Sequence, residues 1–310
     1  MPADSTASTE PAPPGGPPGR LSVPVVVQLI ALTLLWGVNW PIMKIGLADL
    51  APMTFRTLTM VGGLLTLALL ARYRGASLVI PRRYWREAVE LALTNAIVWY
   101  TLSIVGVHLL ASGRAAILGY TLPVWVALIG AVVYRERLGV RVLAGVAFAA
   151  VGVALLLANE LGSIAGRPLG AVSMLLAAAV WGYGTHLMRR RKQPTSLIVL
   201  SFWMVLGGMV VCGVLALLFE SDRPLVWPSA AGWFSIIYNA VLAYGVAQIL
   251  WFRLATVLPP VVSALSVMLI PVVGVASGVV LLGERVVWTD VVALVAILAA
   301  IAATLLPARR

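Results

Sequence analysis

The chain contains the stretch ASGRAAILGYTLPVWVALIGAVVYRERL at residues 111–138 and a second version of it, PPVVSALSVMLIPVVGVASGVVLLGERV, at residues 259–286. Each version is an apolar run long enough to cross a bilayer, with a proline near its middle and a Glu-Arg pair at its end. Pro123 and Pro271 lie 148 residues apart, and the two Glu-Arg pairs have the same separation. This pattern predicts a membrane protein that contains one helical unit twice.

Shorter matches extend the repeat over most of the chain. They keep their order, and loop insertions explain the small drift in their separation. At separations of 145 and 144 residues, the recurring pairs are Trp36-Gly37 with Trp181-Gly182 and Asn95-Ala96 with Asn239-Ala240.

The composition excludes an ordinary soluble domain. Of the 310 residues 61% are apolar and only 11% are charged, which is typical of a polytopic membrane protein. The net charge of +11 would suggest nucleic acid in a soluble protein, but here Lys and Arg stand between apolar runs, where they orient helices. We therefore expect the lipid bilayer and no nucleic acid as partner. Cys212 is the single cysteine, so no disulfide and no metal site is expected.

Apolar runs of about 20 residues predict an all-α membrane protein of ten transmembrane helices, five in each half. The first half covers residues 23–160 and the second 161–310. Residues 1–22, rich in Pro, Gly, Ser and Thr, are expected to form a disordered tail. The predicted spans are residues 25–47, 52–72, 86–107, 111–134, 140–158, 169–188, 195–219, 230–252, 257–282 and 288–306.

The distribution of Lys and Arg predicts that both termini are cytoplasmic. In that orientation sixteen of the 22 basic residues fall in inner segments and six in outer ones. Because each half has an odd number of spans, the second half then enters the membrane inverted relative to the first. Many secondary transporters are built from such inverted repeats, with the substrate site between the halves at the midplane. We therefore expect two inverted five-helix repeats around a central cavity.

Three motifs resemble a known family. They are LLWGVNWPIMK and AVWGYGTHLM in the first span of each half, and APMTFR, a Pro followed by an Arg, at the start of the second span. With the proline-centred fourth span, they resemble the drug/metabolite transporter superfamily, EamA type, and within it bacterial exporters of aromatic amino acids. The second half departs from the pattern at residues 195–202, where no Pro-to-Arg signature opens the seventh span.

The resemblance implies a transporter of the bacterial inner membrane that exports small metabolites and binds no cofactor. It also implies that the first, third and fourth helices of each half line the cavity. Small residues in the fifth and tenth spans would pack either within one protomer or between two protomers. The sequence is therefore compatible with both a monomer and an oligomer.

The mid-helix prolines deprive carbonyl groups of their usual donors. Pro123 leaves the Gly119 carbonyl without one, and Pro271 does the same to the Val267 carbonyl, both near the bilayer centre. Inside a membrane such groups must meet protein or a water-filled cavity. They either face a substrate, whose ammonium group is a natural donor, or mark packing kinks that neighbouring helices satisfy.

Polar and aromatic residues within the spans are the candidate substrate-binding residues. Asn95 and Asn239 either face each other across the cavity or tie helices together. Trp40, near a span end, either adds a ring to the interior of the bundle or serves only as an interface anchor. A cavity with rings and amides but little fixed charge suits a zwitterion with an apolar side chain or a flat organic cation. The candidates are Trp36, Asn39, Asn95, Tyr100, Tyr120, Trp181, Tyr183, Asn239, Tyr244 and Ser266, with Pro123 and Pro271 shaping the helices.

The acidic residues predict transport without proton coupling. All eleven lie in the tail, in loops or at span ends, so no carboxylate stands at mid-membrane, where a proton relay usually has one. His108 and His186 also lie near span ends. We therefore expect a facilitator. Proton coupling through His186 would contradict this expectation.

Among functional classes, the sequence favours a transporter of small amphipathic metabolites, amino acids included, that works by alternating access. An exporter of drug-like organic cations or nucleobase-type solutes is the alternative within the same fold. An enzyme is disfavoured because the chain has no Gly-rich phosphate loop, no His-Glu-x-x-His and no intramembrane Ser, His and Asp set. A membrane scaffold would gain nothing from costly mid-span prolines and amides.

Overall fold

The computed structural model describes residues 23–162, 167–222, 226–248, 250, 254 and 269–305. Within these ranges all regular structure is helical, which confirms the predicted all-α class. The predicted tail at residues 1–22 lies outside the described residues.

Six helices among the described residues are long and apolar enough to cross a membrane. Two of them are interrupted, one by a π-helical segment and one by a break at Tyr120 and Thr121. The uninterrupted helices are α1 (Val23–Asp49), α2 (Pro52–Tyr73), α8 (Pro168–Arg189) and α9 (Leu197–Phe219). The interrupted ones consist of η1 (Arg82–Tyr84), α3 (Trp85–Ala92), η2 (Leu93–Ile97) and α4 (Val98–Leu109), and of α5 (Ser112–Gly119) and α6 (Leu122–Tyr134).

The remaining described helices follow the other predicted spans as far as the structure describes them. The predicted spans 230–252 and 257–282 both run into residues outside the described ranges. These helices are α7 (Val140–Gly162), α10 (Ala230–Ile237), η3 (Tyr238–Val246), α13 (Ile270–Leu282) and α14 (Trp288–Leu305).

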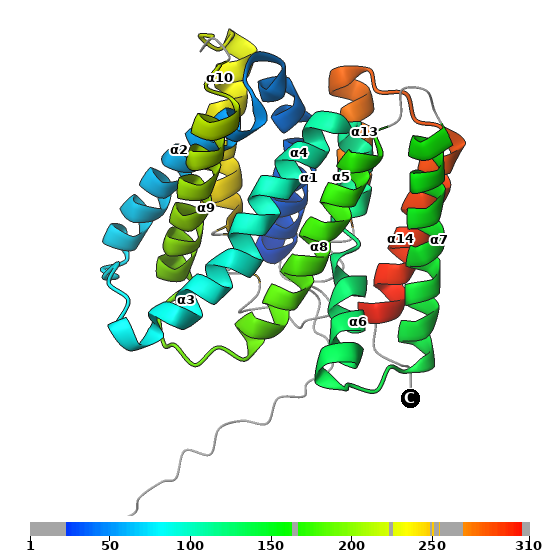
Figure 1. Ribbon diagram of the computed structural model, residues 1–310, viewed down its shortest axis with the longest axis horizontal. Helices are drawn as coiled ribbons and strands as arrows, with labels where there is room; N and C mark the ends of the chain where they lie inside the picture. The colour runs from blue at the N-terminus through cyan, green and yellow to red at the C-terminus, as the bar shows by residue number, and fades with distance from the viewer. Residues whose placement is uncertain are drawn as a thin grey trace, which may run out of the picture.

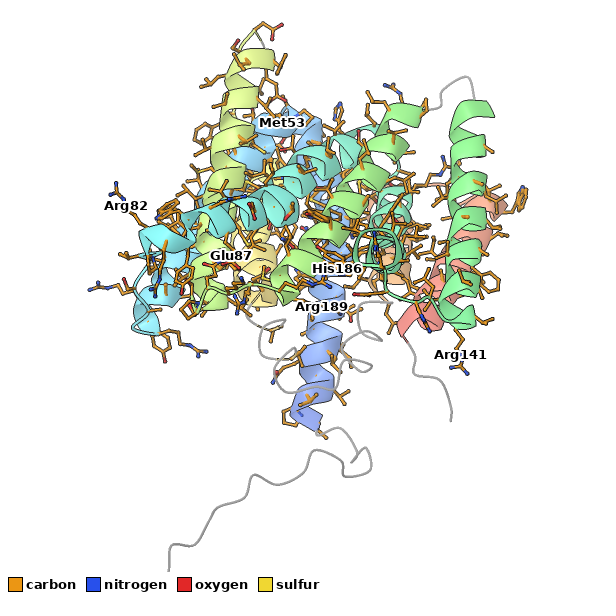
Figure 2. The ribbon with its side chains drawn as sticks, turned by 60° about the horizontal axis from the view of Figure 1, so that its bottom comes forward. Met53, Arg82, Glu87, Arg141, His186 and Arg189 are labelled. Carbon is orange, nitrogen blue, oxygen red and sulfur yellow. The ribbon has the colours of Figure 1, made fainter. Side chains whose placement is uncertain are left out.

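The helices run back and forth between two ends of a bundle (Figure 1). We name these ends by residues. The Asp49 end holds the end of α1 and the beginnings of α2, α5 and α10. The Arg189 end holds the end of α8 and the loop that leads to α9, and the basic residues Arg82 and Arg141 lie at its edges (Figure 2).

Contacts between the first and second parts of the chain hold the bundle together. α1 packs against α13, α2 against α9, α4 against α8, and α7 against α14. Small residues allow the close approach. A methyl group on Gly37 of α1 would overlap the side chain of Val273 and come within 3.2 Å of the Ile270 carbonyl oxygen. Without a hydrophobic drive between helices in lipid, such close packing is a main source of their association.

The small residues of α7 and α14 are used inside the protomer. Ala149, Ala293 and Ala300 are buried. A methyl group on Gly152 would come within 3.1 Å of the Ala293 carbonyl oxygen. The described structure therefore uses these residues to pack α7 on α14 within one chain.

The outward faces of the helices carry large apolar side chains. Leu69 is 70% exposed and Val280 is 80% exposed. Exposed apolar surface on this scale is costly in water, whereas lipid covers it in a bilayer. The exterior is thus that of a protein surrounded by lipid.

The charge distribution predicts which end faces the cytoplasm, and two exposed serines report on it. Ser77 follows α2 near the Arg189 end, and Ser221 follows α9 at the Asp49 end. In intact cells we expect a membrane-impermeant maleimide to label Ser221→Cys and not Ser77→Cys. The native Cys212 is buried and gives little background. Labelling of Ser77→Cys alone would show that the predicted orientation is wrong.

Candidate functional site

A cavity of about 480 Å³ lies in the middle of the bundle. Its described walls come from α1, α2, η2 with α4, the break between α5 and α6, α8, α9 and η3. This volume is within the range that holds small-molecule ligands. The walls include α2 and α9, which the family resemblance did not assign to the cavity.

The structure brings most of the candidate residues together at this cavity. Tyr183 is not among the lining residues, and it is 37% exposed. It stands two positions after Trp181 in α8, which places it about 200° around the helix from that residue. Ser266 lies outside the described residues. The candidates that line the cavity are Trp36, Asn39, Asn95, Tyr100, Tyr120, Trp181, Asn239 and Tyr244.

The two repeat-related asparagines occupy π-helical segments, Asn95 in η2 and Asn239 in η3. Each side chain donates to the carbonyl four residues earlier, Asn95 to Leu91 at 3.1 Å and Asn239 to Ser235 at 3.0 Å. Each amide therefore forms a hydrogen bond within its own helix while it lines the cavity. In the described part of the chain, neither amide forms a hydrogen bond to another helix. Single π-helical turns within α-helices are frequent at functional sites.

Two amide oxygens at the cavity have no protein partner among the described residues. They are the Oδ1 atoms of Asn39 and Asn239, both buried. The orientation of the Asn239 amide follows from its contact, since Nδ2 must face the Ser235 carbonyl. An unpaired buried acceptor costs free energy, and a ligand that supplies an N–H donor removes that cost.

The break at Tyr120 and Thr121 lies just before Pro123, where α5 ends at Gly119 and α6 begins at Leu122. The hydroxyl of Thr121 donates to the Leu118 carbonyl at 2.7 Å, which satisfies one of the groups that the break exposes. In the second half α13 begins at Ile270, next to Pro271, and Val267 lies outside the described residues.

Three aromatic pairs form much of the cavity wall. Trp99 and Trp181 have ring centroids 4.5 Å apart, Tyr100 and Tyr244 5.5 Å, and Trp40 and Tyr120 6.3 Å. Of the two interpretations of Trp40, the structure supports the interior ring, because the residue is only 5% exposed and lines the cavity.

Arg56 of α2 is a cavity residue that the candidate set lacked. It is only 3% exposed, and its guanidinium lies 3.3 Å from the Tyr244 hydroxyl and 3.3 Å from the Ser103 hydroxyl. Thus the expectation of a wall with little fixed charge is wrong at this position. The sequence could have identified Arg56 as a cavity residue, because it stands one turn into an apolar span. Ionisable residues in such spans usually face the protein interior or a cavity.

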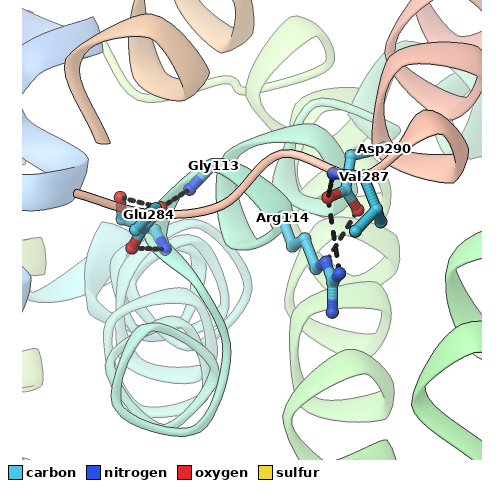
Figure 3. A network of polar contacts seen from close by, with 6 residues as sticks. Gly113, Arg114, Glu284, Val287 and Asp290 are labelled. Carbon is cyan, nitrogen blue, oxygen red and sulfur yellow. Dashed lines mark hydrogen bonds and ion pairs between the residues drawn. The ribbon is translucent and has the colours of Figure 1, made fainter. Parts of the chain in front are cut away.

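Carboxylates at helix beginnings close the Asp49 end. Glu284 accepts from the backbone N–H groups of Ser112 at 2.6 Å and Gly113 at 3.2 Å (Figure 3). Glu220 likewise accepts from Met53 at 2.9 Å and Thr54 at 2.8 Å. Unpaired N–H groups and the helix dipole make such positions favourable for an anion.

Two more contacts join the halves at this end. Arg114 binds Asp290 through two hydrogen bonds of 2.7 and 3.3 Å (Figure 3). Asp49 accepts from the backbone N–H of Ser229 at 2.8 Å. None of these charged residues lines the cavity.

The cavity instead extends to the Arg189 end. Met188, Arg189 and Leu197 belong to its wall, and Arg189 is exposed (Figure 2). Glu136, the repeat counterpart of Glu284, lies at this end and, within the described ranges, forms an ion pair with Arg190 alone, at 3.6 Å. The Glu136 and Arg190 side chains are about half exposed, at 55% and 48%. The two ends therefore differ, because the described cavity wall reaches the Arg189 end, whereas the carboxylates bound to helix beginnings at the Asp49 end lie outside that wall.

His186 is buried and fully engaged beside α6. Its Nε2 lies 2.8 Å from the Val126 carbonyl oxygen, and its Nδ1 lies 3.4 Å from Nη1 of Arg190. His186 does not line the cavity. Among the described residues, no group of three His, Cys, Asp or Glu could hold a metal ion.

Known proteins resemble the chain over most of its length. The uncharacterized transporter YoaV of Bacillus subtilis is 24% identical over 85% of this chain and 90% of its own length. The probable amino-acid metabolite efflux pump of Escherichia coli is 24% identical over 84% of this chain and 87% of its own length. A solved crystal structure superimposes with a TM-score of 0.63 at 20% identity, covering 90% of this chain and 96% of that one, which shows a shared fold.

The family model that matches the chain covers nearly all of it. It is the model of the EamA-like transporter family, and it matches twice, at residues 24–158 and 168–306. The matches include the Trp-Gly pairs, the Pro-to-Arg signature and the proline-centred helices that suggested this family. The chain therefore belongs to the EamA-like transporter family of the drug/metabolite transporter superfamily.

Proposed function

We propose that the chain exports small amphipathic metabolites, amino acids with aromatic side chains among them, across the bacterial inner membrane by alternating access. The observation that carries this proposal is the central cavity of about 480 Å³, which is approached from one end and separated from the other by contacts between the halves. Its aromatic pairs suit an apolar side chain, and its unpaired amide oxygens suit an ammonium group. Relatives that are named amino-acid metabolite efflux pumps support the same substrate class.

The proposed architecture has ten spans in two inverted repeats, residues 23–160 and 161–310. Two separate matches to the family model support a duplicated unit. Alternating access in inverted repeats exchanges the conformations of the two halves. In the opposite state Glu136 would then close its end as Glu284 now closes the Asp49 end, and the Glu284 contacts would open.

A transport assay tests the function. Liposomes containing the purified chain should take up labelled phenylalanine, whereas empty liposomes should not. Trp181→Ala removes a ring that packs on Trp99 and should raise the KM for phenylalanine roughly tenfold. Trp227→Ala, at a side chain that is 81% exposed, should leave uptake unchanged. Absence of uptake of any amino acid by the native chain would refute the proposed substrate class.

We further propose that the transporter is a facilitator. Its support is the position of His186, which contacts the Val126 carbonyl and Arg190 away from the cavity, together with the absence of acidic residues from the described cavity wall. With equal phenylalanine on both sides of the liposome membrane, an imposed pH gradient should drive no net accumulation. Accumulation that His186→Gln abolishes would instead show proton coupling.

The unequal roles of the two repeat-related glutamates predict unequal effects on stability. Glu284→Gln weakens charge-assisted hydrogen bonds to the beginning of α5 and should lower the free energy of unfolding by about 1–3 kcal/mol. Glu136→Gln affects a half-exposed pair that solvent screens, so its effect should stay below about 1 kcal/mol. Thermal unfolding in one detergent compares the two, and equal losses would contradict the proposed closed end.

A further inference from the structure

The cavity wall contains a buried cation whose partners are all neutral. Arg56 is 3% exposed, and its guanidinium contacts the hydroxyls of Tyr244 and Ser103 and lies 5.6 Å from the centre of the Tyr100 ring. Both hydrogen bonds, at 3.3 Å, are long for N–H donors. The Nε atom is buried without a hydrogen-bond partner among the described residues.

No carboxylate in the described part of the chain forms an ion pair with Arg56. Glu220, the acid at the beginning of the same helix, instead accepts through both carboxylate oxygens from Met53 and Thr54. A guanidinium stays protonated in proteins, so Arg56 cannot lower the cost of its burial by losing charge. A buried charge without a counter-ion is strongly unfavourable, and charges in membrane spans usually mark the path of a substrate or ion.

We propose that Arg56 binds the carboxylate group of the transported solute. The guanidinium has five N–H donors, and the contacts with Tyr244 and Ser103 occupy two of them. A carboxylate supplies both the missing charge and acceptors in the planar geometry that a guanidinium fits. The rings of Tyr100 and Tyr244 adjoin this site, so an aromatic or other apolar side chain can pack beside the bound carboxylate.

This inference rests on the proposed function and narrows it. It assigns the substrates to amphipathic carboxylates, which include amino acids and aromatic acids, and it excludes simple organic cations. A fixed positive charge in the wall attracts a carboxylate and repels a cation. Arg56 would therefore both favour carboxylate substrates and disfavour organic cations.

Three probes that share a phenylethyl group distinguish the contribution of the carboxylate to binding from that of the ammonium group. Phenylalanine carries an ammonium and a carboxylate group, 3-phenylpropionate only the carboxylate, and phenethylamine only the ammonium. Calorimetric titration of the purified full-length protein compares them. The variants are Arg56→Gln, Arg56→Lys, which keeps the charge, and Arg86→Gln as a control, since the Arg86 side chain is 93% exposed.

We expect the native protein to bind phenylalanine and 3-phenylpropionate more tightly than phenethylamine. Arg56→Gln should weaken binding of both carboxylates about 30-fold or more and leave phenethylamine no weaker. Arg56→Lys should recover part of that loss, and Arg86→Gln should change nothing. An equal loss for all three probes in Arg56→Gln would show a structural role for Arg56 and overturn the proposal.

The native protein provides a test that does not depend on any variant folding. Binding of phenethylamine as tight as that of 3-phenylpropionate would overturn the proposal for Arg56. Uptake into liposomes separates this outcome from failure of the proposed function. Transport of phenethylamine but neither carboxylate would refute the role of Arg56 while leaving a transporter, whereas transport of none of the three would refute the proposed substrate class as well.

Discussion

The backbone hydrogen bond in a hydrocarbon environment is the constraint on which this structure depends. Lipid offers no donors or acceptors, so a chain that crosses it must satisfy its own N–H and C=O groups, and helices do this within one segment. Departures from the α-helix occur in η2, in η3 and at the break before Pro123, and each of these contributes residues to the cavity wall. Irregular backbone is thus placed where a solute or water, rather than lipid, can meet it.

The same constraint governs the charges. Carboxylates gather at the Asp49 end, where they accept hydrogen bonds from helix beginnings, and Lys44 donates to the carbonyls of Val107, His108 and Leu110 at the end of α4. Arg56 departs from this arrangement because it is buried at the cavity without an acidic partner in the described structure. Natural proteins accept such local costs mainly at functional sites. A cavity formed by aromatic rings, unpaired amide oxygens and one such arginine is chemically suited to a small zwitterion with an apolar side chain.

The all-α class and many of the residues that line the cavity could be predicted from the sequence because lipid leaves few alternatives. Apolar runs located the helices, and the repeated Trp-Gly and Asn-Ala pairs identified Trp36, Trp181, Asn95 and Asn239, all of which line the cavity. The rule that polar side chains in spans face inward supported these assignments.

Other features depend on the rotation and exact length of each helix, which residue type alone does not determine. Tyr183 is an aromatic residue in a cavity helix, yet it lies on the opposite face from Trp181. The sequence left open whether Trp40 lies in the interior or at the membrane interface, and only the structure shows that it is buried. The different contacts of Glu136 and Glu284 could not be predicted from the Glu-Arg pair, which both copies carry, because these contacts depend on the conformation that each half adopts.

A structure of the purified protein with phenylalanine bound would test the central claim most directly. The account predicts the amino acid in the central cavity, its ring among the aromatic pairs and its carboxylate about 3 Å from the guanidinium of Arg56. Phenylalanine bound outside the cavity, or inside it with the carboxylate turned away from Arg56, would contradict the account.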